Sequence, residues 1–543
     1  NTSTITGIDG GTGTNTLTFD NIQHTGGSDL TNWNTINLNN NTNLNLNSNL
    51  ALAGPAGASQ ALNIDLTSTL TATGQRSITG SGPLTVTNAG RIDLSGTTPA
   101  TGDRLVIGGD YVGNNGRITL DSMMGATGSP TDRVLVNGNA SGTTTLHINN
   151  IGGSGAYTGF RNTDGISIVQ VAGTATPGSF ALAGGYVAAG PYQYVLRAFD
   201  PSKAAAGERD ALLGGAGGFY DFRLQSPYSA LLPVPQIAAY QSTMPGMVMM
   251  GGQLLDTMHN RLGEIRHMVG KNMTWSNELF VRAKGSELKF DGDKGPDFRH
   301  NNVFIQMGAT PLRHIDANGG EWHGGVGLAY SDSSIKVPST QSRAEITMPT
   351  VSGMLSYLHP SGWYVDSVLQ ASAIRAKFKT AARGDTGKTS GYGFGASIEG
   401  GYNIQLPANL RIEPQAQLQY QYQHLKGFTD VDQIEVGKLG GSSLIGRIGA
   451  RLMLDRSDEA SRTGTPYVEA NLIRQLAGSS NVVHAAGVDF AGDKVGTMAQ
   501  YGLGVNVQWD KNVAMYLQAR YTQSLGSRGY SGWGGTVGVR ANF

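Results

Sequence analysis

The last fourteen residues of the chain read Y-S-G-W-G-G-T-V-G-V-R-A-N-F, from Tyr530 to Phe543. Before Phe543, every second residue is apolar or small, and the residues between them are polar or small and include Arg540. A period of two puts the two sets on opposite faces of a β-strand. Because a dry core would not accept Arg540, the pattern favours a transmembrane barrel strand, apolar outside and polar inside. An edge strand of a soluble sheet is the alternative for this stretch taken alone.

Eleven further strands can be placed before this one. In 409–425 the outward set is mainly apolar, whereas the inward set holds five Gln together with Arg411 and Glu413. Such a face is costly in a soluble core and natural in a wet lumen. Short connections after every second strand, with mostly longer polar ones between, are typical of outer-membrane barrels. The twelve strands are expected at 276–285, 301–314, 321–331, 346–359, 362–376, 389–405, 409–425, 442–455, 464–475, 494–509, 512–524 and 531–543.

A helix is predicted before the first of these strands, over Met247–Val269. It would be about 30 Å long, and a twelve-stranded barrel has room for one helix about 10 Å wide. We therefore expect the helix to plug the lumen, with an ordinary amphipathic linker helix as the alternative. Its apolar residues recur at spacings of three to four: Leu254, Leu255, Met258, Leu262, Ile265 and Met268.

Ion pairs between this helix and the barrel wall are a further expectation. The alternation points Glu399, Glu413 and Glu469 inward, opposite the cations of the helix. The alternative is that these charges only solvate the lumen. The helix cations are Arg261, Arg266 and Lys271, and Arg447, Arg451, Arg520 and Arg540 line the rest of the lumen.

The first 200 residues contain no Lys and no Glu, and are rich in Asn, Thr, Ser and Gly. Short alternating strands recur, and the phrase N-A-G-R-I-D-L at 88–94 returns as N-N-G-R-I-T-L at 114–120, with a related T-D-R-V-L-V at 131–136. Imperfect repeats of about 20–25 residues without helices predict a right-handed parallel β-helix. A β-sandwich and an unfolded Asn-rich segment are the alternatives. Residues 152–200 are richer in aromatics and would form the packed end of the rod.

Composition limits the function further. The 39 Lys and Arg balance 39 Asp and Glu, so nucleic acid is not expected as a partner. There is no cysteine, and no apolar run of about 18 residues that predicts a membrane helix. The N-terminus has no basic start followed by an apolar stretch, so we expect a processed or truncated chain.

Three segments and the aromatic C-terminus carry a family resemblance: F-Y-D-F-R-L at 219–224, Y-S-A-L-L-P at 228–233 and L-L-D-T-M-H-N-R-L-G-E-I-R at 254–266. With them the whole chain resembles the type Va autotransporters of Gram-negative bacteria, most of all the group of pertactin and the diffuse-adherence adhesins. The resemblance implies an all-β chain whose β-helix is followed by an α-helix inside a twelve-stranded antiparallel transmembrane barrel. It divides the chain into a passenger fragment (1–150), an autochaperone and junction (151–240), a linker helix in the barrel (241–272) and a translocator barrel (273–543).

The same resemblance implies function and partners. The barrel would secrete and display its own passenger, an adhesin or other virulence-associated surface protein, on the cell surface. Periplasmic chaperones, the barrel-assembly machinery, outer-membrane lipid including lipopolysaccharide, and host surface or matrix molecules are the expected partners, and a monomer is expected. The assembly machinery would recognise the terminal strand through Trp533, Val537, Val539 and Phe543.

No catalytic motif, metal site or cofactor is predicted, so the chain is not expected to be an enzyme. In the self-cleaving relatives an Asn-Asn pair precedes the segment that matches 261–266; here Asp256 and Thr257 stand in its place, which predicts no cleavage by that route. The P-loop-like stretch 382–389 lacks the first Gly and opens no helix. Its Arg383, Gly384 and Asp385 form an R-G-D that could contact an integrin. A β-helix hydrolase and a plain porin or uptake channel are the alternative functions.

Overall fold

The computed structural model describes residues 7–226, 233–262, 275–454, 456–457, 463–509 and 512–542. The chain divides into two compact units, Asn1–Val234 and Pro235–Phe543.

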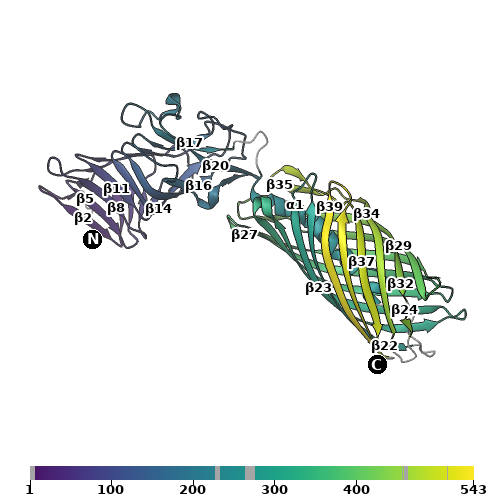
Figure 1. Cartoon of the computed structure of the whole chain (residues 1–543). Helices are drawn as coiled ribbons and strands as arrows, with labels where there is room; N and C mark the ends of the chain where they lie inside the picture. The colour runs from purple at the N-terminus through teal and green to yellow at the C-terminus, as the bar shows by residue number, and fades with distance from the viewer. Residues whose placement is uncertain are drawn as a thin grey trace. The chain divides into compact units, whose positions relative to one another are not determined.

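The first unit is a parallel β-helix, which confirms the predicted solenoid (Figure 1). In its described part each complete turn contributes three strands, one to each of three stacks of parallel strands. The first stack holds β2(Thr16–Asp20), β5(Thr35–Asn39), β8(Gln60–Ile64) and β11(Leu84–Asn88), and the second holds β3(Gln23–Gly26), β6(Asn43–Leu46), β9(Thr69–Thr71) and β12(Arg91–Asp93). The long strands β14(Asp110–Ser122) and β16(Ala140–Asn150) run along both, and the third stack holds β7(Leu50–Leu52), β10(Gln75–Gly80), β13(Arg104–Ile107), β15(Arg133–Val136) and β17(Ile166–Val171).

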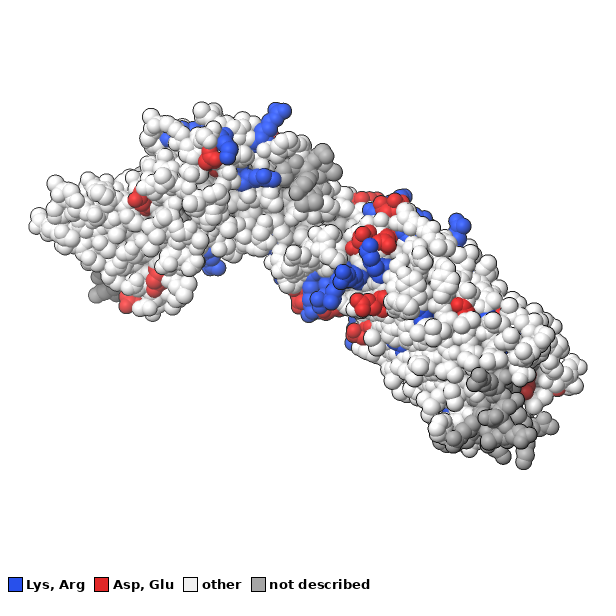
Figure 2. All heavy atoms as spheres, viewed as in Figure 1, with Lys and Arg blue, Asp and Glu red and all other residues white. Residues whose placement is uncertain are grey.

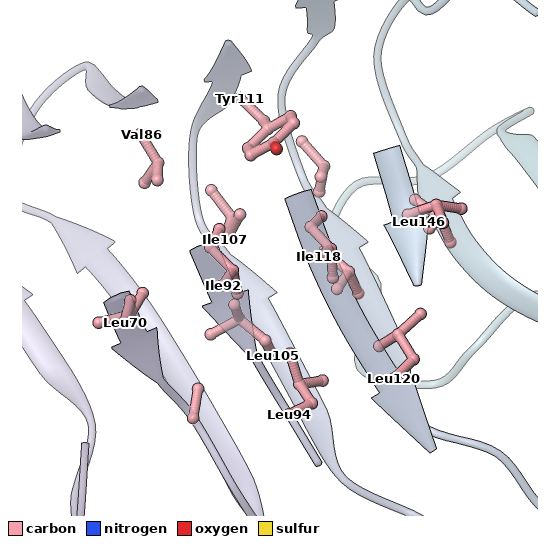
Figure 3. Packing of buried hydrophobic residues seen from close by; sticks show 14 of the residues in the cluster. Leu70, Val86, Ile92, Leu94, Leu105, Ile107, Tyr111, Ile118, Leu120 and Leu146 are labelled. Atoms are coloured by element: carbon pink, nitrogen blue, oxygen red, sulfur yellow. The ribbon is translucent and has the colours of Figure 1, made fainter. Parts of the chain in front are cut away.

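The core of the β-helix is a set of aliphatic columns. Leu70, Ile92, Ile118 and Leu146 are direct partners on successive turns and are fully buried, as Figure 3 shows. Each strand contributes one such residue at every second position, since alternate side chains point inward. Asn residues take the left-handed turns between strands, as Asn40 does at φ 53°, because their short side chains tolerate this conformation. Both features explain why a segment so rich in Asn folds.

The repeated phrase marks successive turns. Arg91 of the first copy pairs with Arg117 of the second, so the prediction that each copy is one turn is confirmed. The related phrase at 131–136 belongs to another stack, where Arg133 pairs with Arg104. Its place in the same series was wrong, because the two stacks share the same inward alternation and differ only in the turns around them.

The C-terminal end of this unit changes from parallel to antiparallel pairing. Strand β21(Tyr220–Gln225) pairs antiparallel with β17 and with β20(Tyr192–Phe199). Phe180 packs edge-on against Phe222 at 4.9 Å between ring centroids. In the segment before β21, Asp210 lies 2.8 Å from Arg133 and 3.3 Å from Arg104, so one carboxylate joins two turns of the third stack. Aromatic packing and antiparallel strands close the end of the coil.

The second unit is a closed antiparallel barrel of twelve long strands within the described residues, as predicted. The last strand pairs with the first from Glu278 with Asn542 to Asp291 with Gly529, which closes the cylinder (Figure 1). The strands are β22(Trp275–Asp291), β23(Phe298–Ile315), β24(Glu321–Val337), β25(Ser342–Leu358), β26(Trp363–Thr380), β27(Gly384–Tyr402), β29(Leu410–Leu425), β32(Leu439–Leu454), β34(Thr463–Gly478), β37(Thr497–Gln508), β38(Val513–Ser524) and β39(Gly529–Asn542).

The strands are longer at one end of the barrel than the alternation predicted. The first was expected to stop at Gly285 and continues to Asp291, and the third continues from Ser331 to Val337. The predicted long connections after the first, third and fifth strands were therefore wrong, because these residues extend the hairpins. The connections after β29 and β34 are long and together form a four-stranded sheet of β30(Phe428–Thr429), β31(Glu435–Val436), β35(Val482–Ala485) and β36(Val488–Ala491). We call this the mouth sheet.

The helix differs from its prediction in extent. Helix α1 spans Pro235–Leu254, and a short α2, Met258–Leu262, follows a break. The predicted start at Met247 was wrong: Pro235 opens the helix, because its missing N–H is not needed in the first turn. The predicted part from Gly263 to Val269 lies outside the described residues. No helix among the described residues is both long and apolar enough to cross a membrane.

Candidate functional site

Helix α1 fills the lumen and is enclosed on nearly all sides. Sixteen of its twenty residues are buried, all of them in the described part of the chain. Its hydroxyls turn back onto the helix, as Ser242 Oγ donates to the carbonyl of Ala238 at 2.8 Å. Tyr240 packs edge-on against Phe378 of the wall and Phe428 of the mouth sheet. A helix surrounded by wall needs no apolar stripe, which is why this one carries polar and apolar residues on every side.

Pro245 lies inside α1 and removes one helical hydrogen bond. Its missing N–H would have bonded to the carbonyl of Gln241. Asn481, from the connection that carries the mouth sheet, donates its side-chain amide to that carbonyl at 2.8 Å. The wall thus supplies the donor that the helix lacks.

The glutamine face of β29 binds the backbone of the helix. Gln423 donates to the carbonyl of Met247 at 2.7 Å, Gln421 to that of Val248 at 3.2 Å, and Gln417 to that of Leu255 at 3.0 Å. From β26, Gln370 donates to Gly251 at 3.2 Å. The N–H groups of these inward amides thus bond to main-chain carbonyls of the plug.

The break between the two helices is held by buried cations of the wall. Asp256 accepts from Lys284 at 2.8 Å and from Arg520 at 3.0 Å. Arg282 donates to the carbonyls of Leu254 and Asn260 at 2.9 and 3.0 Å, so it covers the C-terminal end of α1. These groups are all buried, and unpaired charges would be costly here.

The predicted helix-to-wall ion pairs exist with partly different partners. Arg261 pairs with Asp366 rather than with one of the three predicted glutamates. Glu413 lies 2.7 Å from His259 of α2. The prediction for Arg261 was wrong because alternation fixes the face of a residue and leaves its height along the lumen open. Arg266 and Lys271 lie outside the described residues.

Two of the predicted glutamates bind cations of the wall. Arg447 contacts Glu399 at 3.0 Å, and Arg520 contacts Glu469 at 2.6 Å while it also binds Asp256. Of the other predicted lumen cations, Arg451 lies 4.0 Å from Glu413 and Arg540 4.0 Å from Glu278. Lys284 and Arg282 were missed, although their alternation with Val281 and Ala283 placed them inward.

The start of α1 is fixed at the barrel mouth. Gln236 donates to Asp430 at 3.1 Å and to Asp432 at 2.9 Å, beside the mouth sheet. Tyr240 donates to the same Asp430, and Gln241 donates to the carbonyl of Ala491 at 2.7 Å. The connections of the barrel therefore close around the point where the helix enters.

The R-G-D stretch lies at this same end of the barrel. Arg383 is 3.1 Å from Asp432, and Asp385 is 2.8 Å from Lys377. Gly384 takes the left-handed turn at φ 67°. Both charged side chains thus form ion pairs with other residues of the barrel unit. An integrin contact stays a prediction.

The terminal strand shows the two faces that its sequence predicted. Trp533, Val537 and Val539 are exposed on the outside, at 62%, 51% and 39%, whereas Arg540 is buried inside. The exposed side chains of this strand form the apolar face that a lipid-exposed strand presents. Phe543, the fourth residue of the predicted signal, lies outside the described residues.

Two models of known protein families match the chain, one in each unit. A family model described as the autotransporter beta-domain matches residues 279–520, and one described as the autochaperone domain type 1 matches residues 82–196. The chain belongs to the autotransporter family. The barrel of this autotransporter lies in the outer membrane, with the passenger on the cell surface.

Relatives of this autotransporter differ greatly in length. It is 27% identical over 480 residues to the adhesin BmaC autotransporter of Brucella suis biovar 1, which covers 80% of this chain and 13% of that protein. It is 25% identical over 485 residues to the uncharacterized protein YdeU of Escherichia coli K12, covering 80% and 97%. With the pertactin autotransporter of Bordetella bronchiseptica it shares 26% identity over 291 residues, which are 53% of this chain and 31% of that protein. The chain thus spans about an eighth of the first relative.

Proposed function

We propose that the barrel carries its own β-helix, the passenger, across the outer membrane and afterwards holds it at the cell surface. Helix α1 is the observation that supports this most directly. It follows the passenger unit at Pro235 without an intervening domain and is buried in the lumen. A chain that enters its own barrel in this way has used that barrel as its route.

Surface labelling of intact cells tests this direction of transport. An epitope inserted in the exposed turn at Ala56 of the passenger should be labelled without permeabilisation. The matched control is the same epitope at Asn318, in an exposed turn at the opposite end of the barrel, which should be labelled only after permeabilisation. If the Ala56 epitope is reached only in permeabilised cells, the proposal fails.

Ion conductance in planar bilayers tests whether α1 is a plug. The barrel with its helix should be nearly closed, and deletion of 235–262 should open it. An unchanged conductance would show that the helix does not block the lumen, and a plain porin or uptake channel would then be the better reading.

For the passenger we propose a binding role towards host surface or matrix molecules. Two relatives are named as adhesins, BmaC and the autotransporter adhesin/invasin TibA of Escherichia coli, the latter 28% identical over 232 residues. Cells that display the whole chain should adhere to immobilised matrix proteins better than cells that carry the chain without residues 7–226. Equal adhesion would remove this role.

A hydrolase is less well supported, although the fold brings three carboxylates together. Asp132 accepts backbone N–H groups of Asp103 and Asp121 at 3.0 and 2.7 Å. Asp121 and Asp132 are almost fully buried. Carboxylates that hold backbone turns inside the fold cannot reach a substrate.

We also propose that the chain is not cut between Asp256 and Thr257. Cyclisation at this position needs a side-chain amide, and the Asp256 carboxylate is bound by Lys284, Arg520 and Asn260. The mass of the protein isolated from outer membranes should show the passenger and barrel still joined at this bond.

Insertion into the outer membrane would use the barrel-assembly machinery and periplasmic chaperones, as in the family generally. We propose that the exposed face of β39 is what the machinery recognises. Replacing Trp533, Val537 and Val539 by Ser should lower the amount of barrel in the outer membrane. Equal replacement of the exposed apolar Val303, Ile305 and Met307 of β23 is the control and should lower it less.

A further inference from the structure

Five cations stand side by side on the outside of the barrel. Lys289 of β22 is the cross-strand partner of Arg299 on β23, which is the partner of Lys336 on β24. Lys336 is in turn the partner of Arg343 on β25, and Arg343 of Lys379 on β26. We call these five residues the cation row.

The cation row faces away from the lumen. Lys289, Arg299, Lys336 and Arg343 are exposed and Lys379 is half-buried, whereas their chain neighbours Phe290, Phe298 and Ile335 are buried inside. The row ends at both sides: Lys289 is flanked on β39 by Ser531, and Lys379 on β27 by Asp385. Figure 2 shows charged side chains gathered at one end of the barrel on the face in view.

Like charges directly opposite each other on neighbouring strands repel. Nearby carboxylates neutralise part of the row, since Lys289 contacts Asp291, and Glu345 contacts both Arg343 and Lys379. Among the described residues, none forms an ion pair with Arg299 or Lys336, the second and third cations of the row. The carboxylates that the structure describes therefore leave these two neighbouring cations unneutralised.

The height of the row above the belt of exposed apolar residues indicates which anion would meet it. Val281, Met307, Leu328 and Val351 form one register row of exposed apolar side chains, and Val303, at 62% exposure, is the outermost on β23. Arg299 lies four residues beyond Val303, about 13 Å along the strand and, at a tilt near 40°, roughly 10 Å along the membrane normal. A phospholipid head-group extends only about 5–7 Å beyond the hydrocarbon, so a head-group that extends further meets the row at its own height.

We propose that the cation row binds the phosphate groups on the saccharide head-groups of lipopolysaccharide in the outer leaflet. The inference rests on the proposed direction of transport, which puts this end of the barrel outside, because the start of α1 lies here too. Arg offers a planar fork of donors that matches a phosphate, and Lys adds a point charge. A row across five strands would contact the head-group layer along one side of the barrel.

Lipid binding by the whole chain in detergent tests this inference. Native mass spectrometry would titrate the protein with rough-type lipopolysaccharide whose inner core is phosphorylated, with its chemically dephosphorylated form, and with inorganic phosphate. The phosphorylated lipid should bind tightest. The double variant Arg299→Gln with Lys336→Gln should bind it roughly 30-fold more weakly, as two cations near an anionic surface would contribute.

The matched control is the double variant Lys426→Gln with Arg528→Gln. It removes the same charge at the same end of the barrel, in the connections that follow β29 and β38, outside the row. It should leave binding within about twofold of the unsubstituted protein. The inference is overturned if both double variants weaken binding equally, if dephosphorylation changes nothing, or if inorganic phosphate competes at equal concentration. Surface labelling of the Ala56 epitope in the Arg299 and Lys336 variant reports separately on transport and should be unchanged.

Discussion

Asn481 of the wall donates the hydrogen bond to Gln241 that Pro245 withholds within the helix. The same amide also donates to the carbonyl of Asp493 at 3.1 Å, and Asp493 accepts from the backbone of the β22–β23 connection at Gly295. The two side chains together therefore join the plug to two connections at the barrel mouth.

Asn481→Ala should lower the free energy of unfolding of the barrel by about 1–3 kcal/mol, because it removes the donor from the partly buried carbonyl of Gln241 and from the buried carbonyl of Asp493. Pro245→Ala restores the N–H, so the same Asn481 substitution should cost less in that background. The temperature at which the barrel unfolds in detergent would be measured for the double-mutant cycle. Additive effects would show that the two residues act separately, and Asn318→Ala in an exposed turn is the control.

Asp256→Asn should weaken the plug strongly. It leaves Lys284 and Arg520 buried with less negative charge, and breaking a buried ion pair costs about 3–5 kcal/mol. Conductance should rise and the unfolding temperature should fall. The outward-facing, exposed Glu287→Gln is the control, and a variant of Asp256 that behaves like it would contradict the role of this carboxylate.

Gly538→Ala should disturb the inner end of the helix. An added Cβ would lie 2.0 Å from the Tyr516 ring, and the Tyr516 hydroxyl donates to the carbonyl of Arg261 at 3.0 Å. The Tyr516 ring would have to move, and its hydroxyl would lose the hydrogen bond to Arg261. Gly535→Ala on the same strand is the matched control, since its nearest atom, at 3.6 Å, is in ordinary contact. Conductance of both variants would be compared, and equal values would contradict the prediction.

The passenger should become less stable as the pH rises from about 4 to 7. Burial, with Asp103 and Asp121 nearby, raises the pKa of Asp132 to about 7, whereas in the unfolded chain it is about 4. Across this window the folded state keeps a proton that the unfolded state has lost, so stability falls with rising pH and levels off above 7. Hydrogen exchange of residues 104–136 in the whole chain measures this stability at each pH. Asp132→Asn should reduce its dependence on pH. A pH profile that Asp132→Asn leaves unchanged would assign it to other groups.

The sequence allowed all twelve strands to be placed because lipid outside and polar groups inside enforce alternation along each of them. The same reasoning missed the strand ends, since beyond the lipid the outward residues become Lys289 and Asp291 and the contrast between the faces disappears. Strand pairing depends on backbone hydrogen bonds, so the strands continue beyond the lipid even where the two faces no longer differ in polarity.

The helix and its contacts were harder to predict for a related reason. The period-based prediction began at Met247, but the turns before it contain Tyr240 and Thr243 among apolar residues and show no stripe, since wall surrounds them. Faces could be assigned from alternation, so Glu413 was placed in the lumen. The pairing of Arg261 with Asp366 depends on register between strands and on the break at Asp256, neither of which a single sequence displays.

The amides of β29 meet carbonyl groups of the plug, and every amino acid has a carbonyl group. The barrel therefore holds its helix in a way that depends little on the identity of the side chains, provided that small residues such as Gly251 let the wall approach. Such a holder tolerates drift in the linker sequence, and it offers a route to attach unrelated proteins to the same barrel by keeping the spacing of the small residues and exchanging the rest.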